Sequence, residues 1–289
     1  MCSGCFLVRK KIALFILLLL ASLSANVILA QEYVSRTFRG TRVINGHSIE
    51  TVRTGELEFL ISHRFGFVNR GVYDFFGLDQ ATMRLGFEYG VNDRLMLGVG
   101  RSTYGKHYDV FAKYRLVRQS TDGRIPLSIT LLSTAAIHTL RPTDPNFPLR
   151  LQNRLAYTWQ LLIGGKLSER LSLQFMPTLV HYNLVETPAD HNDLLSVGGA
   201  ARWRFTKNVA FVVEYYYVLP GQRSVDLPNA LAIGFDINTG SHVFQLQFTN
   251  ATGMIEKAFI GESTGYWKRG DIHFGFNLAR TFKLKGRRY

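Results

Sequence analysis

The stretch DQATMRLGFEYGVNDRLMLGVGRSTYGKHYDVFAKYRL, residues 79–116, decides the fold class. Apolar and polar residues alternate along it in three segments, from Ala81 to Tyr89, from Leu95 to Val99 and from Tyr108 to Leu116. Side chains of a β-strand point to opposite faces with a period of two. Each segment therefore has one apolar face and one charged or small face, which is typical of the strands of a transmembrane β-barrel.

The same alternation recurs along the rest of the chain. Besides the strands of the opening stretch, the pattern predicts strands at Gly55–Phe65, Leu127–His138, Leu151–Lys166, Leu171–Tyr182, Leu194–Phe205, Val209–Val218, Asn229–Asn238, His242–Thr249 and Asp271–Leu284. We therefore expect an all-β chain that forms a single antiparallel transmembrane β-barrel of about 12 strands.

The connections between these strands alternate in length. Short turns such as 91–94 and 206–208 fall at one end, and long loops such as 219–228 and 250–270 fall at the other. Outer-membrane barrels have short periplasmic turns and longer extracellular loops. A periplasmic β-sandwich also has alternating strands, but it has no reason to place its long loops at every second joint. With an even number of strands, both termini are expected on the periplasmic side.

The N-terminus has the features of an export signal. Three basic residues precede the apolar run Ile12–Ala21, and small residues follow it. We predict a cleaved signal peptide over residues 1–30, with the cut after Ala30 or, alternatively, near Ala25. A single membrane anchor is the competing interpretation, but the apolar run is short for a span of roughly 20 residues. The mature chain is then expected in the bacterial outer membrane.

The mature chain is predicted to have two parts. Residues 31–54 are polar with weak alternation, which predicts a periplasmic N-terminal segment that lies outside the barrel or in its mouth. Residues 55–289 are predicted to form the outer-membrane β-barrel. Both cysteines, Cys2 and Cys5, belong to the signal, so no disulfide and no cysteine metal site are expected, and no cofactor is predicted.

The formal net charge of +13 includes three basic residues of the signal, so the mature chain carries +10. A basic chain can bind nucleic acid, but an exported chain with no basic helix or stripe is not expected to do so. The expected partners are outer-membrane lipid, lipopolysaccharide and a small solute.

Several stretches resemble an uncharacterised family of Bacteroidota outer-membrane β-barrel proteins, a family of unknown function. The residues that carry the resemblance are GELEFLISHRFG at 55–66, NRGVYDFFGLDQATMRLGFEYG at 69–90, VGRSTYGKHYDVFAKYRLVRQS at 99–120 and HFGFNLARTF at 273–282. The resemblance implies a barrel and an outer-membrane address. It implies no substrate and no catalytic residues.

The polar face of the predicted strands should line the lumen. Its charged members are Glu56, Glu58, Arg64, Arg84, Glu88, Asp109, Lys113, Arg115, Arg154, Lys166, Arg202, Arg204, Glu214, Asp236 and Asp271. Interspersed charges of both signs would either pair across strands as a structural network or line a pore that tolerates anions or sugars.

Three histidines, His107, His138 and His273, share the inward parity near the predicted extracellular ends of their strands. With Asp109 and Asp271 nearby in sequence, they are weak candidates for a metal site. The alternative is that they are polar residues of the rim, because His273 could face the other two across the barrel.

The function that these features favour is a passive channel or transporter for small polar or anionic solutes. A first alternative is a non-conducting structural or docking barrel whose 249–270 loop presents Phe259 and Trp267 to a partner. A second alternative is a hydrolase at the rim, for which Asp109 and His107 would be an incomplete acid–base pair.

Overall fold

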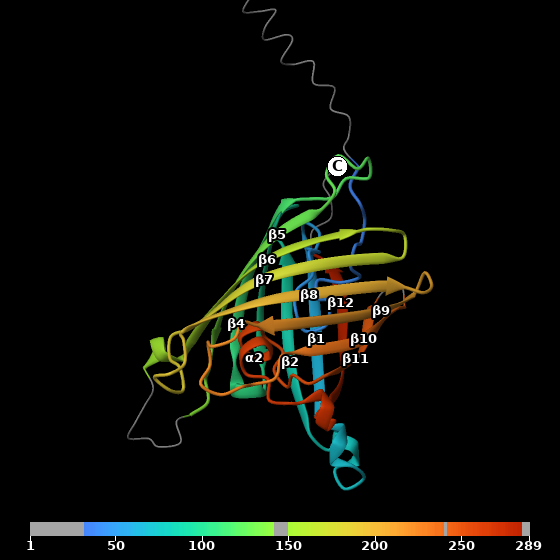
Figure 1. Ribbon diagram of the computed structural model, residues 1–289. Coiled ribbons are helices and arrows are strands. Elements are labelled where there is room, and N and C mark those ends of the chain that lie inside the picture. Colours follow the sequence, from blue (N-terminus) through green and yellow to red (C-terminus); the bar gives the residue numbers. More distant parts are fainter. Residues whose placement is uncertain (1–31, 142–149, 240–241, 285–289) are drawn as a thin grey trace, which may run out of the picture. The chain divides into compact units, whose positions relative to one another are not determined.

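A computed structural model describes residues 32–141, 150–239 and 242–284, and in it the strands form one closed antiparallel barrel (Figure 1). The expected signal peptide lies outside the described residues. The compact unit that contains the barrel begins at Val34.

Twelve strands form the wall, and each pairs with its neighbours in chain order. Their bounds are β1 Glu56–Phe67, β2 Ala81–Gly90, β3 Leu95–Ser102, β4 Tyr108–Val117, β5 Ser128–Ile137, β6 Leu155–Lys166, β7 Leu171–Tyr182, β8 Asp193–Arg204, β9 Val209–Val218, β10 Leu231–Asn238, β11 His242–Thr249 and β12 His273–Lys283. The predicted fold class and strand number are confirmed.

The barrel closes where β1 pairs with β12. The register runs from Glu56 opposite Lys283 to Phe67 opposite His273, with one irregularity near Arg64. Closure pairs the backbone groups that would otherwise form two free sheet edges. A closed barrel satisfies the hydrogen-bonding needs of a backbone surrounded by lipid, whereas an open sheet does not.

The two faces of the wall differ as the alternation predicts. In β2, Arg84 and Glu88 are buried inside the barrel, whereas Leu85 and Phe87 on the other face are 36% and 48% exposed. Exposed apolar side chains lie on the outer face of the strands all around the barrel. Together they form an apolar belt.

The bounds of β7, β9 and β11 are those predicted. The largest difference is in β6, which begins at Leu155 rather than Leu151 because residues Leu151–Arg154 form a turn of 3-10 helix. Strand β12 begins at His273 rather than Asp271, because the Asp271 amide donates to the carbonyl of Tyr266 within the preceding loop.

The helices are short. They are η1 Val68–Arg70, η2 Phe75–Gly77, η3 Tyr104–Lys106, η4 Leu151–Arg154, η5 Trp267–Arg269 and the α-helix α2 Glu256–Gly261. In the described part of the chain, no helix has the length and apolar character needed to cross a bilayer.

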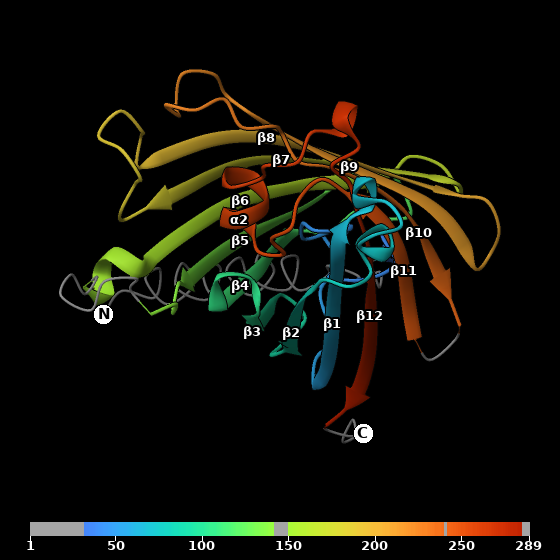
Figure 2. The same cartoon turned by 90° about the horizontal axis from the view of Figure 1, so that it is seen from below.

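Two segments that are not part of the wall occupy its interior. Residues 34–54, here called the plug, enter at the end with the short turns, where the Val34 amide donates to the carbonyl of Gln119. Residues 250–266, here called the α2 loop, fold inward from the end with the long loops. Figure 2 shows α2 within the space that the strands enclose. Apolar side chains of both segments belong to one buried cluster with inward residues of the wall.

Candidate functional site: the filled lumen

The plug forms a hairpin inside the barrel. The Ser48 amide donates to the Thr41 carbonyl at 2.9 Å, and the Val43 amide donates to the Gly46 carbonyl at 2.8 Å. The tip contains Asn45-Gly46, a dipeptide that favours tight turns. The sequence predicts a periplasmic segment that lies outside the barrel or in its mouth, whereas residues 41–49 of the hairpin are all buried.

The tip of the hairpin holds a carboxylate of the wall. The amides of Ile44, Asn45 and Gly46 donate to the carboxylate oxygens of Glu214 in β9, at 3.1, 2.7 and 3.2 Å respectively. Successive N–H groups that converge in this way form a nest that binds an anion. At Gly46 a Cβ atom would lie 2.0 Å from the hydroxyl oxygen of Tyr216, so only glycine fits.

Amide side chains of the wall bind the backbone of the plug. Gln174 of β7 accepts a hydrogen bond from the Ile49 amide at 2.7 Å and donates to the His47 carbonyl at 2.8 Å. Two further amides donate to carbonyl oxygens of the tip: Gln245 to Val43 at 2.7 Å and Asn277 to Ile44 at 2.9 Å. The wall thereby satisfies backbone groups that the hairpin leaves unpaired.

A buried lysine of the wall also binds the plug. Lys113 of β4 donates from Nζ to the carbonyls of Glu50 at 2.6 Å and Thr41 at 3.2 Å. It is fully buried, so these carbonyls and nearby acids replace the water that its charge would otherwise need. Lys113 is one of the predicted lumen residues, and its partner is the plug rather than solvent.

Most of the predicted charged residues do lie inside the barrel. Those that are buried there are Glu58, Arg64, Arg84, Glu88, Asp109, Lys113, Glu214 and Asp236. Ion pairs connect some of them: Arg84 Nε lies 2.9 Å from Asp109 Oδ1, and Arg202 Nε lies 3.2 Å from Asp236 Oδ2. In this conformation the charges form a structural network.

Two of the predicted lumen residues are wrongly assigned. Arg154 belongs to η4 and donates to the carbonyl of Leu140, so it lies at the rim. Asp271 lies in the loop before β12, where Asn69 donates to it at 2.7 Å. Both errors come from strands that begin later than the alternation predicts.

Four of the remaining five lie at the short-turn end of the wall rather than deep in it, and the fifth, Arg202, is the partner of Asp236. Glu56 opens β1 and pairs in register with Lys283, and Arg115 donates to the carbonyl of Asp93. Lys166 and Arg204 both bind Glu169 in an exposed turn, at 3.0 and 3.1 Å. These side chains surround the mouth through which the plug enters.

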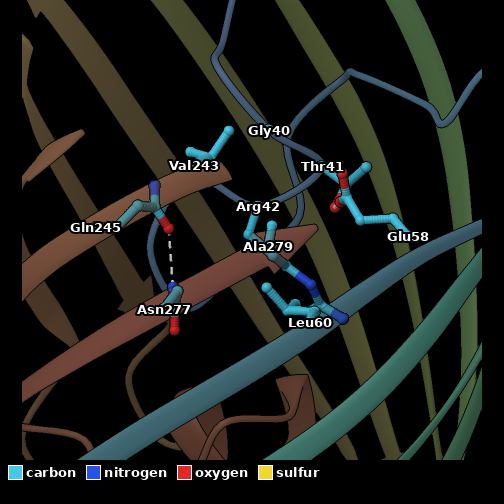
Figure 3. Close-up of a pocket in the computed structure, with 9 residues that line it drawn as sticks. All are labelled: Gly40, Thr41, Arg42, Glu58, Leu60, Val243, Gln245, Asn277 and Ala279. Carbon is cyan, nitrogen blue, oxygen red and sulfur yellow. Dashed lines mark hydrogen bonds between the residues drawn. The ribbon is translucent and has the colours of Figure 1, made fainter. Parts of the chain in front are cut away.

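A small cavity lies between plug residues Thr41 and Arg42 and the wall residues Glu58 and Asn277 (Figure 3). Its volume is about 10 Å³, which is room for roughly one water molecule. A solute could not pass through this cavity while the plug stays in place.

The α2 loop fills the lumen from the opposite end. Phe259 is fully buried with its ring centroid 5.1 Å from that of Tyr216, and the Tyr182 hydroxyl donates to the Lys257 carbonyl at 2.7 Å. The prediction that this loop presents Phe259 to a partner is therefore wrong. Trp267 donates from Nε1 to the Leu231 carbonyl at the rim.

The histidines do not assemble into one site. The rings of His107 and His138 lie 5.1 Å apart, and burial lowers the pKa of His107 to about 4. His273 instead contacts Thr252 Oγ1 at 2.9 Å and the Phe65 carbonyl at 2.7 Å. Among the described residues no group of three or more His, Cys, Asp or Glu side chains could hold a metal ion.

The incomplete acid–base pair is also not formed, because Asp109 is bound by Arg84. The adjacent His47 and Ser48 of the plug do not pair either, since the Ser48 hydroxyl donates to the Gly40 carbonyl at 2.6 Å. Neither arrangement brings a nucleophile and a base together.

Solved structures with a similar fold include porins and a channel. The NanC porin has a TM-score of 0.49 at 10% identity, covering 79% of this chain and 100% of that chain. The KdgM porin has a TM-score of 0.46 at 9% identity, covering 80% and 99%. An outer-membrane channel from Pseudomonas putida F1 has a TM-score of 0.46 at 12% identity, covering 81% and 98%. Likenesses at this level say nothing about the solute.

No curated protein matches the chain in sequence. A family model matches residues 38–282 of the chain, which include most of the plug and nearly the whole wall. The match agrees with the closed barrel and its apolar belt. The chain belongs to the family described as membrane bound beta barrel domain (DUF5777), whose function is unknown.

Proposed function

We propose that this protein is an outer-membrane channel for small polar or anionic solutes that its own plug holds closed. The short-turn end, where the plug enters, would then face the periplasm. Support comes from the wall itself, whose inward side chains are largely polar and carry charges of both signs. Such a wall suits water and polar solutes once the lumen is open.

The observation that carries the proposal is how the plug is held. Its hairpin binds the wall through side-chain hydrogen bonds to backbone groups, for example at Gln174 and Glu214. Every strand of the wall already pairs with two other strands. The plug can therefore leave without breaking a strand pair, and the barrel would remain closed on itself.

The second candidate is a barrel that never conducts. Buried ion pairs such as that of Arg84 with Asp109, and the small cavity beside Glu58, favour it. In that case the polar wall would serve only to hold the plug. The two candidates differ in one measurable property, which is the current through the protein when the plug is loosened.

The test is planar-bilayer recording of the refolded full chain and of Glu214→Ala, which removes the carboxylate that the tip holds. We expect the unmodified chain to be closed for most of the recording and Glu214→Ala to be open about ten times more often. Glu186→Ala, which removes an exposed loop carboxylate, is the matched control and should behave as the unmodified chain. If none of the three carries current at any voltage although each is folded, the channel proposal is wrong.

A further inference from the structure

The plug and the α2 loop contact each other in the middle of the barrel, although they enter from opposite ends. Arg42 Nη1 lies 3.3 Å from Glu256 Oε1, and both side chains are buried. Asn45 at the tip donates to Thr249 Oγ1 at 3.3 Å, just where the α2 loop leaves β11. The two segments therefore meet at a charged contact, and beside it the tip of the plug binds the wall at the residue before the α2 loop.

The buried apolar packing inside the barrel also involves both segments. Val43 and Ile44 of the plug and Phe259 and Ile260 of the α2 loop belong to the same buried cluster, and each is at most 2% exposed. Removing either segment would expose apolar surface of this cluster to water in the lumen, which is unfavourable.

The charges couple the two segments more strongly. Arg42 has two carboxylates nearby, Glu256 at 3.3 Å and Glu88 of the wall at 3.5 Å. Burial, and then the charge of Arg42, lower the pKa of His47 well below its usual value, so His47 is neutral and adds no charge here. If α2 moved out alone, Arg42 would stay buried with one carboxylate fewer, and breaking a buried ion pair from one side is strongly unfavourable.

Hydrogen bonding at this contact is less complete than at the tip. Among the residues that the structure describes, both ring nitrogens of His47, both carboxylate oxygens of Glu88 and Nε of Arg42 are buried without a hydrogen-bond partner. The Glu214 carboxylate, in contrast, accepts from three successive amides. Unsatisfied buried groups cost free energy, so the plug is held less firmly around His47 and Glu88 than at its tip.

We propose that the plug and the α2 loop act as one two-part gate, in which displacement of α2 from the long-loop end loosens the plug. The inference rests on the proposed function, since a gate matters only to a lumen that can open. Contacts that reach the α2 loop from the long-loop end would thereby control the plug, which enters from the short-turn end. Because coupling between two sites is reciprocal, loosening the plug should loosen α2 by the same factor.

Thiol labelling tests this coupling without any current. In the full chain with Cys2→Ser and Cys5→Ser, Val43→Cys places a probe in the plug and, in a second protein, Ala258→Cys places one in α2. Both positions are at most 2% exposed. Gly261→Ala should displace α2, because its Cβ atom would lie 1.8 Å from the Tyr182 hydroxyl oxygen. Gly199→Ala is the control, since nothing lies within 4 Å of the added atom.

We expect Gly261→Ala to raise the maleimide labelling rate of both probes by about tenfold or more, and Gly199→Ala to leave both unchanged. Faster labelling in α2 with no change at the Val43→Cys probe would show that α2 moves alone and would overturn the proposal. If Gly261→Ala changes the labelling rate of neither probe, Glu256→Gln removes the charge directly. An unchanged labelling rate of the Val43→Cys probe in Glu256→Gln would overturn the proposal as well. Labelling that responds as expected in a protein without conductance would leave the coupling of the two segments standing and refute only the channel.

Discussion

Neighbouring residues of one strand meet opposite surroundings in this barrel. Arg84 is 1% exposed and bound to Asp109, whereas Leu85, next to it, is 36% exposed on the outer face. The period of two makes this difference predictable from sequence, because a residue's parity decides its face. Depth in the membrane is a separate property, and the register of the strands determines it.

The depth of a residue in the membrane should determine how much a charge on the outer face lowers the free energy of unfolding. Leu85 lies opposite Arg101, an outward cation towards the end of β3, whereas Val99 lies between Phe87 and Val110. We expect Val99→Arg to lower the free energy of unfolding in lipid vesicles by roughly 2–4 kcal/mol and Leu85→Arg by no more than about 1 kcal/mol. Urea titration followed by tryptophan fluorescence measures both. Equal losses would contradict the assignment of Val99 to the membrane interior.

At the scale of elements, the plug hairpin depends on close packing at its tip. Gly46→Ala would bring a Cβ atom within 2.0 Å of the Tyr216 hydroxyl oxygen, whereas Gly40→Ala meets nothing within 4 Å. Overpacking of this kind costs roughly 1–3 kcal/mol. We expect hydrogen exchange of the Ile44 and Asn45 amides to accelerate about tenfold or more in Gly46→Ala and to stay unchanged in Gly40→Ala. Unchanged exchange in both variants would mean that the tip does not need glycine.

The strands could be predicted because the alternation of apolar and polar residues that marks them is local in sequence. Each wall strand shows its two faces within about ten residues, and the alternation predicts the bounds of β7, β9 and β11 correctly. It does not predict the starts of β6 and β12, because the turns next to them continue the apolar and polar pattern. For that reason it wrongly places Arg154 and Asp271 in the lumen.

The site could be predicted only in part. Parity predicts that Glu214 and Lys113 point inward, but their partners lie in the plug. Asn45 is 169 positions from Glu214 along the chain, and Glu50 is 63 positions from Lys113. No periodicity connects residues so far apart. The Asn45-Gly46 dipeptide and the apolar residues around Phe259 were the available signals, and both indicate a folded segment without indicating where it packs.

At the scale of the whole molecule, the strands of the wall and the hairpin of the plug are held in place by different kinds of bonds. The wall is a continuous ladder of backbone hydrogen bonds that closes at β1 and β12. The hairpin of the plug is attached through side chains such as Gln245 and through buried apolar contacts. Among the described residues, backbone bonds to the wall occur only near the ends of the plug, at Val34 and Thr54. The wall should therefore fold without the plug, whereas the hairpin of the plug exists only inside the wall.

This separation leads to a test in which the plug is supplied from outside. A chain that lacks residues 34–54 should still fold to a barrel, as measured by its resistance to unfolding in sodium dodecyl sulfate before heating, and should carry a steady current. A synthetic peptide with the sequence of residues 34–54 should block that current from the short-turn side only, because the mouth that receives the plug lies there. In the peptide carrying Gly46→Ala the tip no longer fits beneath Tyr216, so it should block about tenfold more weakly. Current that neither peptide reduces would show that the plug closes the lumen only as part of the intact chain.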